Sequence, residues 1–241
     1  MTTTTPERVG QASPAFYGFV RLLFTVLTPL FARLRTEGIE NIPREGPVII
    51  ALNHIAWTDI PLMSLRVPRI THYMAKIELF NIFLLGGILR LAGSFPVRRG
   101  EGDRESIRNA EQLLKQGEAL VVFPEGHRSR TGQLQAGHPG TAYLALRSGA
   151  PVVPVAIFGT QHTLKGLRYG PFAPRVTVRY GKPVRFEGLD GKRNRETLAR
   201  AADQIMRGIA AQLPPEYRGP YADLDSTEII AGRADATEAE D

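Results

Sequence analysis

The chain has 241 residues, of which 43% are hydrophobic and 22% charged, so it can build a packed core and lacks the composition of a disordered protein. It contains no cysteine, which excludes disulfide scaffolds, thiolate metal sites, iron–sulfur clusters and covalent intermediates on a thiol. The formal net charge of +6 is unevenly distributed: residues 214–241 hold two basic and eight acidic side chains, which leaves residues 1–213 with 28 basic and 16 acidic ones. A body with a net charge of +12 favours an anionic partner, such as nucleic acid, a phosphate-bearing substrate or an acidic membrane surface.

Polar sequence marks both ends of the chain. Residues 1–14 are predicted to form a disordered lead, because they are polar and contain two prolines. Residues 214–241 begin with a Pro-Pro pair and continue as acidic sequence of low hydrophobicity, which predicts a disordered tail. No segment has the approximately 20 apolar residues that span a bilayer comfortably, and the N-terminus lacks the pattern of a secretory signal.

Residues 15–35 carry apolar side chains at steps of three and four, with a narrow polar stripe opposite them. This periodicity predicts an amphipathic helix that is kinked or interrupted near Pro29. Its apolar face would lie either on the protein's own core or in a membrane interface, where Arg21, Arg33 and Arg35 would meet lipid headgroups. A second aromatic and aliphatic patch, residues 79–85, supports the membrane alternative.

Strand-like and helix-like segments alternate between these ends. The expected strands are 47–52, 70–75, 94–97, 119–123, 151–158 and 175–180, the last with the alternation of an edge strand. The expected helices are 60–65, with Thr58 as its cap, 78–91, 103–116, 141–147 and 193–213. This alternation predicts a single α/β domain over residues 36–213, with a mixed, largely parallel sheet flanked by helices. Ligands of such sheets bind beyond the carboxyl ends of the strands.

The first polar cluster at a strand end is Asn53 to Asp59. His54 and Asp59 are five residues apart, and in a strand-to-helix turn the carboxylate can fold back onto the imidazole. A carboxylate on one ring nitrogen fixes the tautomer and leaves the other nitrogen free as a base. This spacing alone is common, so by itself it does not distinguish a catalytic pair from a structural one.

Two further polar clusters follow other strands. Phe123 to Arg130 combines Gly126, where backbone can approach a ligand, with the guanidinium groups of Arg128 and Arg130, which suit a phosphate. A third basic cluster spans residues 95–100. Each arginine pair alone is compatible with an ordinary solvated surface, but the three clusters together indicate a binding site at one edge of the sheet.

These clusters resemble the motifs of the glycerolipid acyltransferase family, specifically its 1-acylglycerol-3-phosphate (lysophosphatidate) acyltransferases. The family's N-H-x-x-x-x-D motif stands here as Asn53, His54 and Asp59. The other motifs match residues 76–79 with 93–99, then Phe-Pro-Glu-Gly-x-Arg-Ser at 123–129, and finally Val-Pro-Val at 153–155. The order and spacing agree across residues 34–185, which makes the resemblance far more specific than any single motif.

The resemblance implies acyl transfer from acyl-CoA or acyl-carrier protein to the sn-2 hydroxyl of 1-acylglycerol-3-phosphate, which gives phosphatidic acid. In that reaction His54 would be the general base and Asp59 would orient it, and direct attack agrees with the missing cysteine and the missing G-x-S-x-G nucleophile motif. No metal and no cofactor are expected. The residues expected to bind the acceptor are Lys76, Arg99, Glu125, Gly126 and Arg128. Backbone amides in the turn after His54 are candidates for stabilising the oxyanion.

Two departures from the family pattern affect the expected acceptor site. His127 stands where threonine is common, and Arg98 stands where an acidic or polar residue is common. They keep open an acyltransferase for another lyso-acceptor, either a lysophospholipid with a larger headgroup or a lyso-aminolipid. Three further classes remain. One is a non-catalytic lipid-binding relative, and another is a nucleic-acid-binding module, for which the sequence contains no recognition motif. The third is a metal enzyme that uses residues such as Glu125, although the sequence lacks the ligand spacing of the zincin metalloproteases.

The partners expected from this interpretation are a lipid acceptor, an acyl thioester donor and a membrane surface, without nucleic acid. Because both the acceptor and the product reside in a bilayer, we expect a peripheral or monotopic enzyme on the cytoplasmic face of the cell membrane. Residues 15–34, and with them residues 79–89, would provide the attachment.

Overall fold

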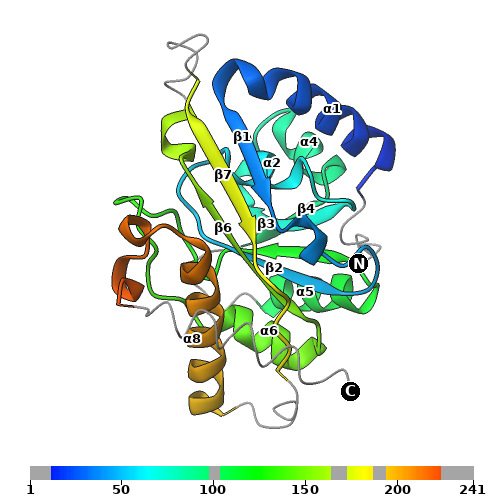
Figure 1. The fold of residues 1–241 in the computed structure, drawn as a ribbon. Coiled ribbons are helices and arrows are strands. Elements are labelled where there is room, and N and C mark those ends of the chain that lie inside the picture. Colours follow the sequence, from blue (N-terminus) through cyan, green and yellow to red (C-terminus); the bar gives the residue numbers. More distant parts are fainter. Residues whose placement is uncertain (1–11, 98–103, 164–172, 187–193, 224–241) are drawn as a thin grey trace, which may run out of the picture.

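A seven-stranded sheet forms the centre of the protein in the computed structural model, which describes residues 12–97, 104–163, 173–186 and 194–223 (Figure 1). The strands are β1 (Arg33–Glu37), β2 (Val48–Leu52), β3 (Thr71–Lys76), β4 (Ser94–Val97), β5 (Ala119–Val122), β6 (Val152–Phe158) and β7 (Arg175–Tyr180). Their order across the sheet is β1-β7-β6-β2-β5-β3-β4. Only the β6–β7 pair among these strands is antiparallel, so the predicted mixed, largely parallel sheet is confirmed.

Helices cover both faces of the sheet (Figure 1). They are α1 (Pro14–Phe31), α2 (Asp59–Ser64), α3 (Ile77–Phe80), α4 (Leu85–Leu91), α5 (Arg104–Lys115), α6 (Gly140–Ser148) and α8 (Arg195–Gln212). Short 3₁₀ turns are η1 (Ile39–Asn41), η2 (Thr160–His162), η4 (Pro215–Tyr217) and η5 (Gly219–Tyr221). Local sequence sets the helix starts: the Ser13 hydroxyl accepts from the Phe16 amide before α1, and the Asn194 side chain accepts from the Thr197 amide before α8.

The core has two parts, one on each face of the sheet. β2 contributes to both, because all five of its residues are apolar and fully buried and successive side chains point to opposite faces. One part joins the sheet to α5, α6 and α8 and contains Leu113 and Ile209. The other joins it to α2 and to the inner side of α1 and contains Leu62. The sheet therefore separates an α1–α2 face from an α5–α6–α8 face.

The parallel pairing brings the carboxyl ends of five strands to one edge. Ala51 pairs with Val122, so the turns after β2 and β5 leave the sheet at nearly the same level, while β6 continues to Phe158, three residues past Val155, the partner of Leu52. Lys76, the last residue of β3, pairs with Val97, the last residue of β4. The polar clusters expected from the sequence thus follow strands that end at one edge of the sheet.

Several element boundaries differ from the prediction. The helix predicted over 15–35 ends at Phe31, and residues 33–37 form β1, whose alternating polar side chains gave no core pattern. β1 is the edge strand, so the interpretation of residues 175–180 as an edge is wrong. The interruption predicted near Pro29 is not seen: α1 continues to Phe31, although proline has no amide to donate to the Thr25 carbonyl.

Two further differences concern residues 78–91 and 214–241. The helix predicted over 78–91 is broken between α3 and α4, where Leu84 has a φ of 65°, a left-handed conformation that is uncommon for a leucine. The prediction of a disordered tail from residue 214 is wrong for residues 214–223. Residues 215–221 form η4 and η5, with Tyr217 and Tyr221 packed against the core, and residues 224–241 lie outside the described residues, as do residues 1–11 of the predicted lead.

Helix α1 has an apolar outer side and packs a mixed side against the protein, where Phe24 and Phe31 contact the core and Thr28 is buried. The Arg21 guanidinium donates to the Val67 carbonyl at 3.1 Å, and the Tyr17 hydroxyl lies 3.0 Å from that of Thr71. Arg21 therefore does not face outward, as the sequence interpretation had it. The exposed apolar side chains of the helix are Phe19, Leu22, Leu23, Val26, Leu27 and Leu30. Such an outer side differs from the polar, solvent-facing side of an amphipathic helix on a protein surface in water.

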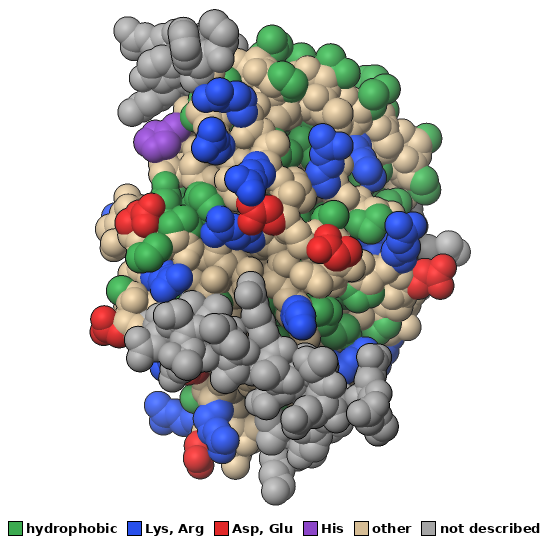
Figure 2. All heavy atoms as spheres, in the orientation of Figure 1, with side chains coloured by type: hydrophobic (Ala, Val, Ile, Leu, Met, Phe, Trp, Pro, Cys, Tyr) green, Lys and Arg blue, Asp and Glu red, His purple; other side chains and the backbone are tan. Residues whose placement is uncertain are grey.

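The exposed side of α1 continues onto α4. The Ser13 amide donates to the Leu91 carbonyl at 3.0 Å, so the start of α1 adjoins the end of α4. Ile82, Phe83, Leu84, Ile88 and Leu91 are exposed as well, and Phe83 is 89% exposed. We call these residues and the exposed side of α1 the apolar surface. Figure 2 shows hydrophobic side chains along this rim of the molecule, with Lys and Arg side chains beside them. α1 is also the one described helix long and apolar enough to cross a membrane, contrary to the prediction from segment length.

Candidate active site

The centre of the site is a buried pair formed by His54 and Asp59. His54 follows β2 and Asp59 is the first residue of α2, so the turn between them reverses the chain and brings the two side chains together. The distance from His54 Nδ1 to Asp59 Oδ2 is 2.8 Å. Because the carboxylate accepts, Nδ1 carries the proton of the neutral ring and Nε2 keeps its lone pair. Nε2 has no hydrogen-bond partner among the described residues.

Asp59 is fixed by its own turn. The same Oδ2 accepts from the amides of Ile55 at 2.7 Å and Ala56 at 2.8 Å, and the residue is completely buried. These two amides are therefore occupied, which rules against their predicted use as oxyanion donors. Thr58 precedes the helix without capping it, and its hydroxyl lies 3.2 Å from that of Thr163 instead. The carboxylate of Asp59 instead fixes the turn that precedes α2, through the amides of Ile55 and Ala56.

His54 is also held through its ring and its backbone. Its ring stacks on Phe123, the residue after β5, with centroids 4.0 Å apart and an interplanar angle of 20°. Its amide donates to Glu125 Oε1 at 2.8 Å, and its carbonyl accepts from the Ser129 amide at 2.8 Å. The loop after β5 therefore fixes the position of the imidazole, while Asp59 fixes its rotation.

Glu125 lies beneath the site rather than facing its opening. The residue is 1% exposed, and its second oxygen accepts from the Gln135 amide at 3.0 Å. Burial raises the pKa of the Glu125 carboxyl to about 7, although the amides of His54 and Gln135 act in the opposite direction. The predicted contact between Glu125 and the acceptor is therefore not supported by this geometry. The carboxylate ties the turn after β2 to the loop after β5.

Asn53 joins the site to β6, a role that sequence reasoning missed. Its side chain reproduces a strand pairing: Nδ2 donates to the Ile157 carbonyl at 2.9 Å and Oδ1 accepts from the Ile157 amide at 2.7 Å. The partner is 104 residues away in the sequence, so no local signal could have shown it. The asparagine keeps β2 and β6 together where the chain leaves the sheet.

The turn after β5 presents the predicted phosphate-binding residues. Gly126 has a φ of +70°, and a Cβ there would lie 3.1 Å from the ring of His138, so a larger residue would be strained. Arg128 is exposed and makes no ion pair with the described residues. His127 and His138 are exposed on the same loops. Arg128 is thus available to an anion arriving at this edge.

The remaining two predicted residues are Lys76, the last residue of β3, and Arg99, two positions after the end of β4 in the sequence. Lys76 is exposed and its Nζ lies 3.1 Å from Glu78 Oε1. Arg99 and Arg98 lie outside the described residues. Because Lys76 pairs in register with Val97, the chain that leads to Arg99 leaves the sheet beside Lys76. Within the described ranges, no three His, Asp or Glu side chains form a group that could hold a metal ion.

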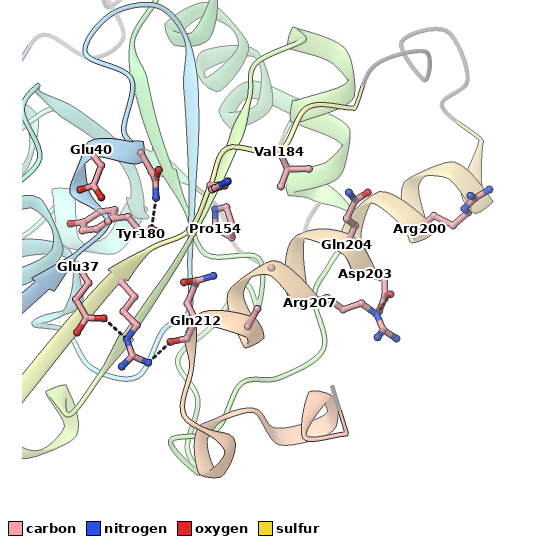
Figure 3. A pocket seen from close by; sticks show the side chains of 17 residues that line it. Glu37, Glu40, Pro154, Tyr180, Val184, Arg200, Asp203, Gln204, Arg207 and Gln212 are labelled. Carbon is pink, nitrogen blue, oxygen red and sulfur yellow. Dashed lines mark hydrogen bonds and ion pairs between the residues drawn. The ribbon is translucent and has the colours of Figure 1, made fainter. Parts of the chain in front are cut away.

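One cavity lies away from this site. It measures about 950 Å³ and lies between α8 and the β1–β7 edge, as Figure 3 shows. Two of its basic side chains are paired with acidic ones: Arg179 Nε lies 2.8 Å from Glu37 Oε2, and Arg207 Nε lies 2.6 Å from Asp203 Oδ2. A smaller cavity of about 470 Å³ is lined in part by Ile55, which follows His54 in the chain, and by Ser129, whose amide donates to the His54 carbonyl. The smaller cavity therefore lies next to the His54 turn, although His54 itself is not part of its lining.

Comparison with known proteins agrees with this geometry. Residues 33–158, more than half of the chain, match the profile of the Acyltransferase family. The 1-acyl-sn-glycerol-3-phosphate acyltransferase of Bacillus subtilis is 28% identical over 201 residues, which cover 82% of this chain and 98% of that protein. The lyso-ornithine lipid O-acyltransferase of Pseudomonas aeruginosa is 33% identical over 183 residues, which cover 68% of each chain.

A solved structure supports the fold as well. The crystal structure of the 1-acyl-sn-glycerophosphate (LPA) acyltransferase PlsC from Thermotoga maritima is similar with a TM-score of 0.61 and 28% sequence identity. The match covers 81% of this chain and 77% of that one. The predicted resemblance is confirmed at the level of the family and the fold.

Proposed function

Because the chain belongs to the acyltransferase family, we propose that it transfers a fatty acyl group from an acyl thioester to the sn-2 hydroxyl of 1-acylglycerol-3-phosphate. The observation that carries this proposal is the buried His54–Asp59 pair, whose Nε2 is free at the sheet edge where strand ends converge. The products are phosphatidic acid and a free thiol.

His54 acts as general base in this proposal. Nε2 removes the proton of the acceptor hydroxyl as its oxygen attacks the thioester carbonyl, a role worth about 10²–10⁴ in rate. Asp59 balances the positive charge that develops on the ring. When the tetrahedral intermediate collapses, the carbon–sulfur bond breaks and the imidazolium returns the proton to the thiolate. No acyl-enzyme forms, and His54 ends neutral.

Basic residues at the same edge would hold the phosphate of the acceptor. Arg128 supports this role because it is exposed without an ion pair among the described residues, and a guanidinium can bind phosphate in a bidentate manner. Lys76 and Arg99 would assist. Gly126 would let the backbone approach the acceptor, and Glu125 would act as a positioning residue through the His54 amide.

The apolar surface would dock the enzyme on a bilayer. Transfer of the exposed side chains of α1 and α4 out of water is favourable, and the basic body is attracted to anionic lipid. Arg33 and Arg35, exposed just beyond α1, suit lipid headgroups. We place the enzyme on the cytoplasmic face of the membrane, with acyl-CoA or acyl-carrier protein as donor and no cofactor.

A second candidate acceptor is a lyso-aminolipid. The relative that acylates lyso-ornithine lipid is more identical to this chain than the relative from Bacillus subtilis, although over a smaller share of it. Such an acceptor lacks the phosphate of lysophosphatidate, so it would make no use of Arg128.

An acceptor panel tests the two candidates. Purified protein is incubated with oleoyl-CoA and either lysophosphatidate, lyso-ornithine lipid or monoacylglycerol. The released CoA thiol is measured with a thiol reagent, which has no background from the protein because the chain contains no cysteine. We expect release with lysophosphatidate, and Arg128→Ala should lower kcat/KM for it about tenfold. Arg200→Ala, which removes the same charge from α8, is the matched control. Faster release with lyso-ornithine lipid, unaffected by Arg128→Ala, would instead establish the second candidate.

A further inference from the structure

The smaller cavity beside His54 has no role in the mechanism above. Its walls come from four segments: Ile55 in the catalytic turn, the loop 129–133, Gln161 of η2, and η4 with Glu216 and Tyr217. Its volume of about 470 Å³ lies within the range of about 300–1,000 Å³ that is usual for small-molecule sites.

The walls of this cavity are fixed by hydrogen bonds. The Ser129 amide donates to the His54 carbonyl at 2.8 Å, so the loop 129–133 is anchored on the catalytic residue. The Gly132 amide donates to the Ser129 hydroxyl at 3.1 Å, and the Leu134 amide donates to the Tyr217 carbonyl at 2.8 Å. The cavity is thus formed before any ligand arrives.

The polar groups that remain available in the cavity fit a particular ligand chemistry. Gln133 Nε2 donates to the Glu216 carbonyl at 3.2 Å, and Gln161 Nε2 donates to the Tyr217 hydroxyl at 2.9 Å. These bonds use the amide nitrogens and leave both side-chain carbonyl oxygens as acceptors. Arg130 is exposed and has no hydrogen bond or ion pair with the described residues. The cavity therefore offers acceptors for amide N–H groups and one guanidinium for a phosphate.

The cavity borders Arg128 but lies apart from Lys76 and from the apolar surface. Tyr217 packs against the core on the α5–α6–α8 face, whereas α1 covers the other face of the sheet (Figure 1). The walls of the cavity include the segments after β2, β5 and β6, whereas Lys76 ends β3, which lies beyond β5 in the sheet. A lipid from the apolar surface and a second substrate from water can thus approach His54 from different sides.

We propose that this cavity binds the phosphopantetheine arm of the acyl donor, with Gln133 and Gln161 accepting from its amides and Arg130 binding its phosphate. This inference rests on the proposed function in taking the donor to be a thioester. The arm carries two amides and one phosphate and is shared by CoA and acyl-carrier protein, so one cavity serves either source. Glu216, the acidic side chain of the lining, suits the arm's hydroxyl.

Arg130→Ala tests the proposal, with Arg200→Ala as matched control and unchanged thermal unfolding required of both. The donors are octanoyl-CoA, octanoyl phosphopantetheine, octanoyl-carrier protein and octanoyl pantetheine, which lacks the phosphate. We expect Arg130→Ala to raise KM about tenfold for the three phosphate-bearing donors and to leave kcat and the acceptor KM within about twofold. With octanoyl pantetheine the variant and the wild type should be equal, and Arg130→Lys should restore part of the loss.

The outcomes separate the alternatives. A higher KM for octanoyl-CoA alone would assign Arg130 to the nucleotide phosphates and overturn the placement of the arm. A higher KM for the acceptor would make the cavity part of the acceptor site, and no change would leave it an ordinary hydrated recess; both overturn the proposal.

A binding measurement keeps this test independent of turnover. His54→Ala protein should bind S-octyl phosphopantetheine, a thioether that cannot react, as tightly as wild type does, and about tenfold more tightly than Arg130→Ala protein does. If the enzyme fails to acylate lysophosphatidate but shows this difference, the proposed acceptor is wrong and the donor site stands. Equal binding by wild type and Arg130→Ala overturns the donor site alone.

Discussion

The turn that carries His54 and Asp59, between β2 and α2, buries polar groups, whereas the apolar surface exposes apolar ones. In the turn, polar groups are buried and paired: Asp59 is inaccessible, and its Oδ2 accepts from His54, Ile55 and Ala56. On the apolar surface, side chains such as Phe83 face outward while Arg21 of the same region bonds inward. Buried polar groups stabilise a structure only when paired, and apolar groups only when removed from water.

This difference indicates which part of the protein is complete in isolation. The turn already satisfies nearly all of its hydrogen-bonding groups, with Asp59 Oδ1 a buried exception. The apolar surface has no such complement among the described residues, and an exposed apolar patch of this kind is typical of an interaction surface. We therefore expect substitutions in the turn to change chemistry, and substitutions on the surface to change where the protein resides.

Asp59→Asn should have the largest effect, and it tests whether substitutions in the turn change chemistry without changing membrane binding. The neutral side chain of asparagine cannot balance the charge of an imidazolium. Its NH₂ group also cannot accept from the backbone amides of Ile55 and Ala56, which donate to Asp59 Oδ2 in the wild type. We expect kcat to fall by about 10²–10⁴ with vesicle binding unchanged. Initial rates and vesicle sedimentation measure the two properties, and a loss of both would contradict the division.

A surface substitution should show the converse behaviour. Val26 is 65% exposed on α1, and Val26→Glu places a charge where lipid contact is proposed. We expect vesicle binding to weaken about tenfold or more, with turnover of a detergent-soluble acceptor retained. Gln204→Glu, on the exposed side of α8, introduces the same charge as a control. Equal binding by the two variants would mean that α1 does not contact the membrane.

A smaller effect concerns Glu125 and pH. Burial raises the pKa of this carboxyl to about 7, so the folded state favours the protonated form, while in the unfolded chain the group titrates near 4.5. Its contribution to stability is therefore fully present below about pH 4.5, declines as the pH rises toward 7, and then levels off. Glu125→Gln cannot ionise and should lack this decline.

Thermal unfolding from pH 4 to 8 measures the effect of Glu125. The difference in melting temperature between wild type and Glu125→Gln should change steadily between about pH 4.5 and 7, to the disadvantage of wild type, and then remain constant. Curves that run parallel over the whole range would show that this carboxyl does not titrate differently in the folded protein.

The sequence predicted the pair His54 and Asp59 because its spacing and its place after a buried strand are local features. It did not predict how the pair is held, because Glu125 and Ile157 are 71 and 104 residues away from their partners and come near only through the sheet. The assignment of Glu125 to acceptor binding stays a prediction, and the sequence could not show that both of its carboxylate oxygens bond to backbone amides, because a motif identifies a residue without showing which way it points.

The apolar helix shows a second limit of sequence reasoning. Periodicity in residues 15–35 identified a helix with two faces, and the same pattern fits a helix packed on a core or lying in a bilayer. The choice depends on contacts such as that of Tyr17 with Thr71, which pairs α1 with a distant strand. β1 was missed because its polar residues alternate without an apolar run.

Turnover by wild type and His54→Ala, measured side by side, tests the central claim most directly. Both proteins receive oleoyl-CoA and lysophosphatidate in liposomes, thiol release is followed, and phosphatidate is identified in the product. The account predicts release by wild type and a loss of about 10²–10⁴ in the variant, with the same vesicle binding and a cooperative unfolding transition in both. Turnover by His54→Ala at the rate of wild type would contradict it.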